Sequence, residues 1–414
     1  MIYVLYIIVS IICVYTARHY WFTLNRLFGF QRHPYIDIDT ADWPPVTVLV
    51  AAHNEEKVIA NILSALMTVK YPGDKMLVVP VNDRSTDRTR EIVDEFVERF
   101  PGRIRPFHRV TGKGGKAAAL KDAMEMVETE VILIFDADYI PGSGLIKQLA
   151  APFFDPEVGG VMGRVVPLNC GTNLLTRLLD LERSGGYQVD QQARMNLLLV
   201  PQHGGTVAGV RLSALREIGG WNDRTLTEDT DLTYRLLLHG WKTVYQNRSE
   251  CYEEVPETWQ VRIKQIMRWA KGHNQAMVTY GLQLLFGQHR ATLRERLDGA
   301  LLLGVYIMAP FTMVGWVLAL AVFYQGVAPL HGVLAILGVT AYATVGNMAA
   351  FFEIAAAVRL DGNCKRIRLL PFLILGFTVS IFAVSWAAFS QVKDALTGAE
   401  FHWDKTERYR KAAS

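Results

Sequence analysis

Four long apolar stretches constrain the fold of this chain more than any other feature of its sequence. They cover residues 2–16, 299–324, 327–357 and 369–394. A helix of roughly 20 apolar residues crosses the hydrocarbon core of a bilayer, so the last three stretches are long enough, and the first becomes so when residues 17–22 are added. The middle of the chain has an ordinary mixture of polar and apolar residues. We therefore predict an integral membrane protein that carries one sizeable soluble domain.

The charges around the apolar stretches predict the orientation of the chain. No basic segment precedes the first stretch and no clear small-residue cleavage site follows it, which argues against a cleaved signal peptide. Arg18, Arg26 and Arg32 follow it instead. Because basic residues favour the cytoplasmic side, we expect a cytoplasmic soluble domain and a location in the plasma (inner) membrane.

The same rule places the basic loop at 359–368 and the basic tail after residue 404 in the cytoplasm. Three simple crossings that start in the cytoplasm cannot bring both segments to that side. One stretch is therefore predicted to be re-entrant, interfacial or a broken hairpin. Pro310, Gly338 and Gly346 are candidate interruptions.

Charge and cysteine content exclude several other classes of protein. The chain has 43 basic and 40 acidic residues, a net charge of +3 that is too even for a nucleic-acid-binding surface. Its four cysteines stand far apart and lack the spacing of a metal site. Reduced thiols are therefore predicted in place of a disulfide framework.

Between about residues 44 and 250, short strand-like runs alternate with helical segments, which is typical of a mostly parallel sheet with helices on both faces. The runs are 46–52, 76–81 and 131–136. In such a sheet, ligands bind beyond the carboxyl ends of the strands. Polar residues follow the three runs at that point: His53, Asn54 and Glu55, then Asn82 and Asp83, then Asp136 and Asp138. The sequence thus predicts a binding site at this edge.

Asp136 and Asp138 flank one residue at the end of an apolar strand, so their side chains leave the same face. Two neighbouring carboxylates repel each other unless a cation lies between them, and oxygen ligands suit Mg²⁺ or Mn²⁺. The alternative is a pair of solvated loop acids. Their position at the end of a buried strand favours a divalent-metal site that shares the ion with a substrate phosphate.

Two neighbouring motifs have both a structural and a functional interpretation. Asp83 could accept a hydrogen bond from a pyrimidine base or a ribose, or it could cap the following helix. The glycine-rich turn at 111–117 matches a dinucleotide-binding spacing, but the run before it is a poor buried strand. Lys113 and Lys116 on this turn fit an anion contact better, with a solvated helix start as the alternative.

Two later motifs also have both a structural and a functional interpretation. Glu228 and Asp229 precede a helical segment, where a carboxylate is either a helix cap or a general base for a hydroxyl nucleophile. Gln265, Arg268 and Trp269 share one face of an amphipathic helix. That helix suits the cytoplasmic leaflet of a membrane, and Arg268 could also pair with phosphate while Trp269 offers a flat face to a sugar ring.

Taken in chain order, these motifs resemble those of the membrane-integrated family 2 glycosyltransferases, which include cellulose, chitin, hyaluronan and poly-N-acetylglucosamine synthases. The motifs are Asn-x-Glu at 54–56 with Glu55 inside it, Asp83, Asp-Ala-Asp at 136–138, Thr-Glu-Asp at 227–229 and Gln-x-x-Arg-Trp at 265–269. The resemblance covers about residues 46 to 275. It implies an α/β fold of type A (GT-A) with a mostly parallel sheet, interfacial amphipathic helices and a helical transmembrane region.

The resemblance also implies roles for individual residues. Asp229 would be the base that deprotonates the acceptor, and Asp136 and Asp138 would hold Mg²⁺ or Mn²⁺. Contacts to the nucleotide-sugar would come from Asn54, Glu55, Asp83, Lys113, Lys116, Asp136, Gln265, Arg268 and Trp269. Contacts to the acceptor would come from Gly205, Thr206, Glu228 and Trp269. A looser likeness to a gating segment involves Trp403, Lys405, Thr406 and Arg408.

The implied organisation has five parts. They are a membrane helix with an interfacial segment (1–30), the glycosyltransferase domain (44–255), interfacial helices (256–297), transmembrane helices (298–396) and a cytoplasmic tail (397–414).

The implied reaction is an inverting transfer of glucose or N-acetylglucosamine from a UDP-sugar to a growing β-linked polysaccharide, coupled to export. The alternative is a non-processive glycolipid synthase similar to ceramide glucosyltransferases. Outside enzymes, a transporter or an inactive receptor could keep the fold, but neither would need Asp229. The expected partners are a UDP-sugar, a polysaccharide or lipid acceptor, and membrane lipids.

Overall fold

The computed structural model describes residues 1–35, 42–326 and 344–397. Its centre is an eight-stranded sheet with the strand order β3-β2-β1-β4-β7-β6-β8-β5. The strands are β1 (Val46–Ala52), β2 (Met76–Asp83), β3 (Phe107–Arg109), β4 (Val131–Asp136), β5 (Ile140–Pro141), β6 (Val158–Pro167), β7 (Ala208–Arg211) and β8 (Lys242–Glu253). The first four strands are parallel to one another, and β7 is antiparallel to both of its neighbours. The predicted mostly parallel sheet is confirmed.

The central strands form because their side chains are apolar on both faces. In β1, Val46, Val48 and Val50 point into one core, while Leu49 points into the other. β-Branched residues fit a pleated strand well, and a parallel strand that is covered on both sides has no use for polar alternation. The two cores give the domain three layers: helices, sheet, helices.

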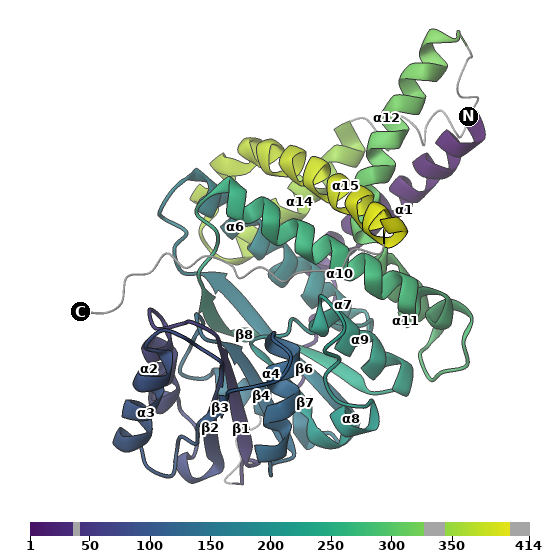
Figure 1. Cartoon of the computed structure of the whole chain (residues 1–414). Helices are drawn as coiled ribbons and strands as arrows, with labels where there is room; N and C mark the ends of the chain where they lie inside the picture. Colours follow the sequence, from purple (N-terminus) through teal and green to yellow (C-terminus); the bar gives the residue numbers. More distant parts are fainter. Residues whose placement is uncertain (36–41, 327–343, 398–414) are drawn as a thin grey trace.

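Helices cover both faces of this sheet (Figure 1). The face that contains Val48 is covered by α2 (Ile59–Thr68), α3 (Thr89–Arg99) and α5 (Leu145–Ala150). The face that contains Leu49 is covered by α4 (Lys116–Ala123), α8 (Leu212–Glu217) and α9 (Glu228–His239). The helix α6 (Leu174–Ser184) runs into a π-helical segment (Gly185–Gln191) and then into α7 (Gln192–Asn196).

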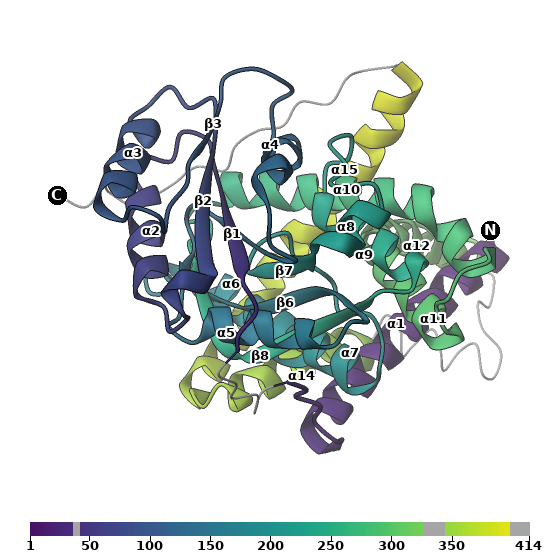
Figure 2. The same ribbon diagram turned by 90° about the horizontal axis from the view of Figure 1, so that it is seen from below.

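The remaining helices surround one end of this domain. They are α1 (Ile2–Phe28), α10 (Trp259–Phe286), α11 (Leu293–Leu303), α12 (Met308–Tyr324), α14 (Thr344–Leu360) and α15 (Leu373–Thr397), with a 3-10 segment, Cys364–Phe372, before α15. In Figure 1, α1 and α12 project away from the sheet, whereas α15 runs beside α10. Figure 2 shows α14 and the C-terminal part of α1 on the side of β8.

Three helices in the described part of the chain are long and apolar enough to cross a membrane: Ile2–Phe28, Val305–Tyr324 and Cys364–Thr397. The candidate interruption at Pro310 does not break α12. It lies in the first turn of that helix, where backbone N–H groups have no partner within the helix and proline is tolerated. Gly338 lies outside the described residues.

Candidate active site

The strand register brings the predicted site residues together. Ala51 of β1 lies opposite Asp136 of β4, and Ala52 lies opposite Asn82 of β2. The carboxyl ends of three parallel strands therefore finish side by side, as the sequence predicts.

A cavity of about 1620 Å³ opens at this edge of the sheet. It extends from the strand ends to α10, to the start of the apolar region after α11, and to the end of α15. Most of the predicted site residues line it: Glu55, Asp83, Lys113, Lys116, Asp136, Asp138, Thr206, Glu228, Asp229, Gln265, Arg268 and Trp269. Residues more than 180 positions apart in the chain thus face one space.

Asn54 was predicted to contact the nucleotide-sugar, but it is not among the residues that line the cavity. Its backbone has a positive φ of 54°, and its side-chain oxygen accepts a hydrogen bond of 2.7 Å from the backbone N–H of Thr86. Asparagine tolerates this left-handed conformation and commonly closes such turns. Asn54 therefore shapes the loop after β2 and does not face the ligand space.

Asp83 is buried and already paired with arginines. One oxygen accepts hydrogen bonds from Arg109 at 2.7 Å and from Arg84 at 2.9 Å, and the other accepts from the backbone N–H of Gly115 at 3.2 Å. Arg109 also bonds to Asp122 and to the carbonyl of Lys113. Asp83 thus holds the glycine-rich turn against the sheet at the edge of the cavity. Arg109 is a residue that the sequence reasoning missed, since it lies in the short strand β3.

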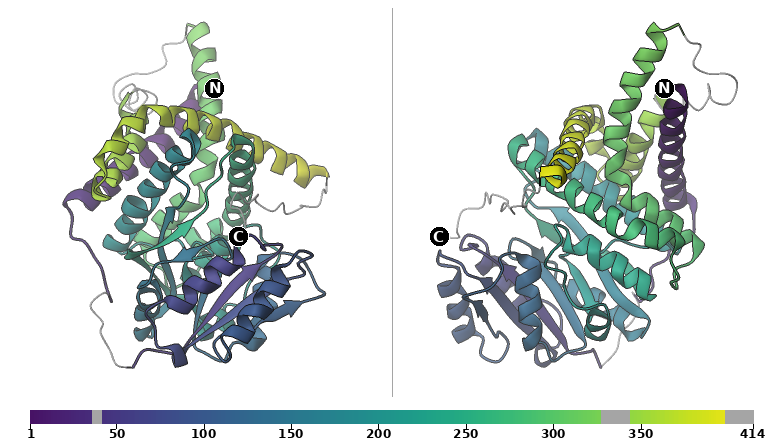
Figure 3. Two further views of the ribbon diagram at one scale, coloured as in Figure 1. Left: turned by 90° about the vertical axis from the view of Figure 1, so that its left-hand side faces the viewer. Right: turned by 45° about the vertical axis from the view of Figure 1, so that its right-hand side comes forward.

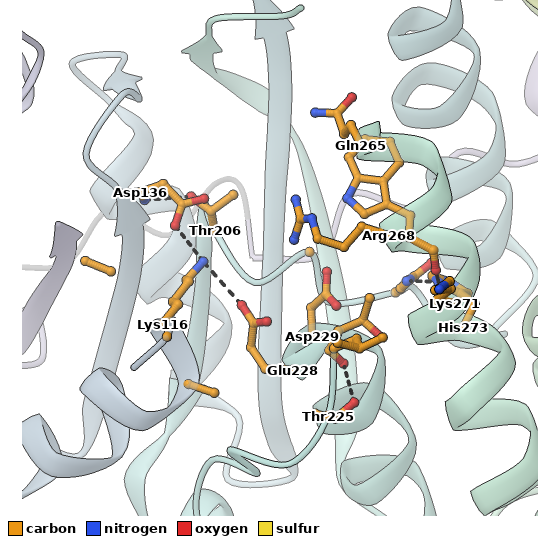
Figure 4. Close-up of a pocket in the computed structure, with 18 of the residues that line it drawn as sticks. Lys116, Asp136, Thr206, Thr225, Glu228, Asp229, Gln265, Arg268, Lys271 and His273 are labelled. Carbon is orange, nitrogen blue, oxygen red and sulfur yellow. Dashed lines mark hydrogen bonds and ion pairs between the residues drawn. The ribbon is translucent and has the colours of Figure 1, made fainter. Parts of the chain in front are cut away.

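Lys116 joins the two acidic halves of the cavity. Its ammonium lies 2.6 Å from Asp136, 3.5 Å from Glu228 and 2.8 Å from the carbonyl of Gly205 (Figure 4). Burial opposes the charged form, but Asp136 and Glu228 together raise the pKa of Lys116 above its ordinary value. The lysine is therefore a fixed positive charge between β4 and α9. Lys113 lies nearer the rim, where its ammonium donates to the backbone carbonyl of Asp223.

Gly205 and Thr206 form a close backbone contact with the strand ends. The hydroxyl of Thr206 accepts a hydrogen bond of 3.0 Å from the backbone N–H of Asp136. Gly205 has a φ of +70°, and a Cβ there would lie 3.1 Å from the Cβ of Asp229 and 3.2 Å from Glu228. A glycine is required at this position because the loop passes so close to the acidic pair.

Glu228 and Asp229 begin α9 and point into the cavity (Figure 4). Burial raises the pKa of Asp229, although the backbone N–H of Thr230 and the charges of Lys116 and Arg268 act in the opposite direction. Burial also raises the pKa of Glu228. A carboxylate whose pKa is raised in this way is a stronger proton acceptor than a solvated one, which suits a general base.

The face of α10 that bears Gln265, Arg268 and Trp269 closes the cavity from the opposite side. The ring of Trp269 contacts two guanidinium groups, with its centroid 5.3 Å from that of Arg183 and 5.5 Å from that of Arg262. Arg262 also donates to the side-chain oxygen of Gln265 at 3.0 Å. The motif is therefore held by cation–π and hydrogen-bond contacts from its own helix and from α6.

Three more residues that line the cavity were not predicted from the sequence: Tyr139, Arg183 and Glu253. Arg183 pairs with Glu253 at 2.5 Å, and Glu253 accepts from the hydroxyl of Tyr139 at 2.7 Å. Tyr139 directly follows Asp138, which is the only sequence signal that could have pointed to this group.

The donor set at the strand ends fits a hard divalent cation in part. Asp136 opens to the cavity and Asp138 is buried beside it, and both supply oxygen. Among the residues described, no three His, Cys, Asp or Glu side chains gather closely enough to hold a metal ion by themselves. An ion here would need further oxygens from a bound substrate, as is usual for Mg²⁺ sites. The gating residues predicted at Trp403, Lys405, Thr406 and Arg408 lie outside the described part of the chain.

Comparison with known proteins identifies the family to which this chain belongs. Residues 44–272 match the family model described as glycosyltransferase like family 2. The chain is 30% identical over 405 residues to the probable glycosyltransferase YdaM of Bacillus subtilis, covering 93% of this chain and 94% of that protein.

Two further relatives share parts of their length with this chain. The beta-monoglucosyldiacylglycerol synthase of Synechocystis is 34% identical over 59% of this chain and 51% of its own length. The probable glucomannan 4-beta-mannosyltransferase 7 of rice (Oryza sativa subsp. japonica) is 29% identical over 81% of this chain and 57% of its own. The chain therefore spans about half the length of these two relatives.

Among solved structures, a mannosyltransferase from Pyrobaculum calidifontis, determined with GDP-Man and Mn²⁺, superimposes with a TM-score of 0.59 at 21% identity. The match covers 85% of this chain and 98% of that one, which confirms the GT-A-like fold. Family model, relative and fold agree: this chain is a member of glycosyltransferase family 2.

Proposed function

We propose that the protein is an inverting glycosyltransferase that moves a sugar from a UDP-sugar to a hydroxyl of an acceptor at the membrane surface. One observation carries the proposal. A single cavity joins the Asp136–Asp138 pair, the base candidate Asp229 and the arginine and tryptophan of α10, although these come from distant parts of the chain.

In the proposed reaction, Asp229 accepts the proton of the acceptor hydroxyl while that oxygen attacks the anomeric carbon. The bond between the anomeric carbon and the diphosphate breaks in the same step. A single displacement inverts the anomeric centre, so an α-linked donor gives a β-linked product. Arg268 and Lys116 offset the negative charge that develops on the departing diphosphate.

A divalent ion would be held by Asp136 and Asp138, and its chemistry when bound is to neutralise diphosphate charge. The solved mannosyltransferase with Mn²⁺ supports this assignment at the level of the fold. Release of UDP from UDP-glucose and UDP-N-acetylglucosamine, measured with EDTA and with added Mn²⁺, tests it. We expect EDTA to abolish release and Mn²⁺ to restore it. Undiminished release in EDTA would contradict the metal assignment.

The acceptor is expected to come from the membrane, because the cavity wall includes Leu302, Val305 and Tyr306 where the apolar helices begin. The glycolipid synthase relative supports a lipid acceptor.

The second candidate is synthesis of a β-linked polysaccharide with export, which the glucomannan mannosyltransferase relative supports. Products made from a labelled UDP-sugar in membranes distinguish the two. A single lipid-soluble product is expected for a glycolipid synthase, and a ladder on a sizing gel for a polymerase.

A further inference from the structure

One glutamine in the cavity wall joins the helix that carries the proposed base to the helix that closes the cavity. Gln202 lies in the loop before β7, is half-buried and lines the cavity. The nitrogen of its side-chain amide lies 3.2 Å from the hydroxyl of Thr230 on α9 and 3.2 Å from the Nε2 atom of His273 on α10. Gln202 and His273 belong to none of the motifs identified in the sequence, and the proposed reaction does not yet use them.

The backbone of Gln202 is held in place by a second glutamine. Gln191, at the end of the π-helical segment, donates to the carbonyl of Gln202 at 2.9 Å and accepts from its backbone N–H at 3.0 Å. The amide of Gln191 thus binds the main chain at residue 202 with both its nitrogen and its oxygen. π-Helical turns are rare and occur frequently at functional sites. This pair of hydrogen bonds fixes the point from which the Gln202 side chain enters the cavity wall.

The partners of Gln202 determine which end of its amide is free. The Nδ1 atom of His273 lies 3.3 Å from the carbonyl oxygen of Trp269, which can only accept, so Nδ1 carries the proton. Burial lowers the pKa of His273 to about 4, so the ring is neutral and its Nε2 atom can only accept. The amide nitrogen therefore faces His273 and uses its two hydrogens on His273 and Thr230. Among the described residues, no hydrogen bond reaches the amide oxygen of Gln202.

The same partners place Gln202 between the proposed base and an apolar helix. Thr230 directly follows Asp229 and donates its backbone N–H to that carboxylate at 2.7 Å. On the other side, the ring of His273 packs edge-on against the ring of Tyr306, with centroids 4.8 Å apart. Tyr306 lies just before α12. Figure 3 shows α12 and α1 rising from the end of the domain that α10 covers.

This position belongs to the acceptor side of the cavity. In Figure 4, His273 lies on one side of Asp229, whereas Lys116 and Asp136 lie on the other. The diphosphate and its metal ion are assigned to the side of Lys116 and Asp136. An acceptor that reaches Asp229 from the apolar helices must therefore pass Gln202.

The chemistry of the transfer limits what can bind to the free oxygen of Gln202. A hydroxyl group has a single proton, and the attacking hydroxyl gives its proton to Asp229. The attacking hydroxyl thus cannot donate to Gln202 in the same step. We propose that Gln202 binds the acceptor, and that its amide oxygen accepts a hydrogen bond from a second hydroxyl of the acceptor. His273 is a positioning residue, which holds the amide of Gln202 in this orientation.

The inference rests on the proposed function and adds the chemical class of the acceptor. The acceptor head group must carry at least two hydroxyl groups, as a sugar or the end of a polysaccharide does. A head group with one free hydroxyl, such as that of a diacylglycerol, would displace water from the amide oxygen and leave it without a partner. An unpaired polar group of this kind weakens binding.

Identification of the product tests the class of acceptor. Membranes with and without the full chain are given labelled UDP-glucose or UDP-N-acetylglucosamine, and the labelled products are identified by mass spectrometry. We expect an acceptor that carried two or more hydroxyl groups before the transfer. A product built on an acceptor with a single hydroxyl would overturn the inference and leave the proposed function intact. If the wild-type protein released UDP from neither donor, the proposed function would fail and the inference with it.

Two substitutions of Gln202 test the contact itself. Gln202→Met keeps the length of the side chain and removes its polar atoms, whereas Gln202→Glu keeps an accepting oxygen and loses the two donated hydrogen bonds. The measurement is the ratio of labelled sugar transferred to membrane acceptors to labelled sugar released by hydrolysis. We expect Gln202→Met to lower this ratio about tenfold or more, with UDP affinity within a few-fold of wild type, and Gln202→Glu to restore most of it. An unchanged ratio in Gln202→Met, or equal losses in both variants, would overturn the inference.

His273→Phe tests the positioning role, because phenylalanine can still pack against Tyr306 but cannot accept from Gln202. We expect the same ratio to fall several-fold while UDP affinity is kept, and a full ratio would show that His273 does not orient the amide. The matched control is Gln391→Met. Gln391 of α15 also lines the cavity, but its side chain bonds to Asn274 and to the backbone of α10. This control should leave the ratio unchanged, and a loss as large as that of Gln202→Met would overturn the assignment to Gln202.

Discussion

Asp229 lies between the positive charges of Lys116 and Arg268 at the start of α9, and burial raises the pKa of its carboxyl group. Its assignment as the base rests on this environment and on its position in the cavity. The alternative is a structural role at the helix start, where its oxygen accepts a hydrogen bond of 2.7 Å from the backbone N–H of Thr230. Mutation separates the two.

We expect Asp229→Asn to lower the transfer rate by about 10²–10⁴-fold, which is the usual contribution of a general base. The amide keeps the shape of the side chain and cannot take the proton. UDP binding, measured by calorimetry, should stay within a few-fold of wild type. Transfer within a few-fold of wild type would show that Asp229 has only a structural role.

The raised pKa of Asp229 predicts the acid side of the pH profile. The base must be deprotonated, so kcat/KM should fall as the pH drops through a pKa that is higher than that of an exposed aspartate. Because the charge of Arg268 lowers this pKa, Arg268→Gln should move the acid limb to still higher pH. Profiles of kcat/KM for both proteins check the direction. A limb that stays in place in the variant would mean that another group controls it.

At the scale of elements, the position of α10 depends on a glycine. Gly272 packs directly against Thr227, the residue before Glu228, and a Cβ at Gly272 would come within 2.2 Å of the Thr227 side chain. A Cβ on residue 272 and the side chain of Thr227 cannot occupy the same space. The helix that carries Arg268 and Trp269 therefore approaches the loop that carries Asp229 only because residue 272 has no side chain.

We expect Gly272→Ala to lower kcat at least tenfold, because α10 must move away from the base. Gly281→Ala is the matched control in the same helix, since its nearest neighbour is Met277 at 3.9 Å. It should keep full activity and should stabilise the helix by up to about 1 kcal/mol, because alanine favours helix more than glycine does. Equal activity of the two variants would contradict the proposed close contact.

For the whole molecule, a buried ring of charges joins α1 to the catalytic domain. Arg18 pairs with Asp298 at 2.9 Å and with Asp190 at 3.3 Å. Arg194 pairs with Asp190 at 3.0 Å and also contacts Asp298. Three of the four side chains are almost fully buried. The ring fixes the first apolar helix, α1, to the π-helical segment, α7 and α11.

Removal of one partner from such a ring leaves another charge buried without compensation. We expect Arg18→Met to lower the free energy of unfolding in detergent by about 3–5 kcal/mol. The control is Lys242→Met, which removes an exposed pair with Glu157 and should cost no more than about 1 kcal/mol. Thermal or denaturant unfolding of both variants checks the difference. Equal losses would mean that the ring does not hold α1.

Much of the fold was predictable, because β-branched runs and amphipathic helices carry their own periodicity. The carboxyl ends of β1 and β4 were predicted to converge, and their register confirms it. The role of Asn54 was less accessible, since its backbone φ of 54° follows from the loop it closes. Arg183 and Arg262 were missed as well. A lone arginine has no sequence pattern that reveals a contact with Trp269 across two helices.

The amino-acid sequence was enough to predict the apolar segments, the strands and the order of the acidic motifs, because these depend on residue type and short-range spacing. It could not determine where each apolar segment is attached to the rest of the protein, since hydropathy measures composition and not attachment. The tertiary structure places Arg366, just before α15, against Asp180 of α6, and Asp394, near the end of α15, against Lys271 of α10. Contacts between residues more than 100 positions apart set that geometry, and no local pattern in the chain encodes them.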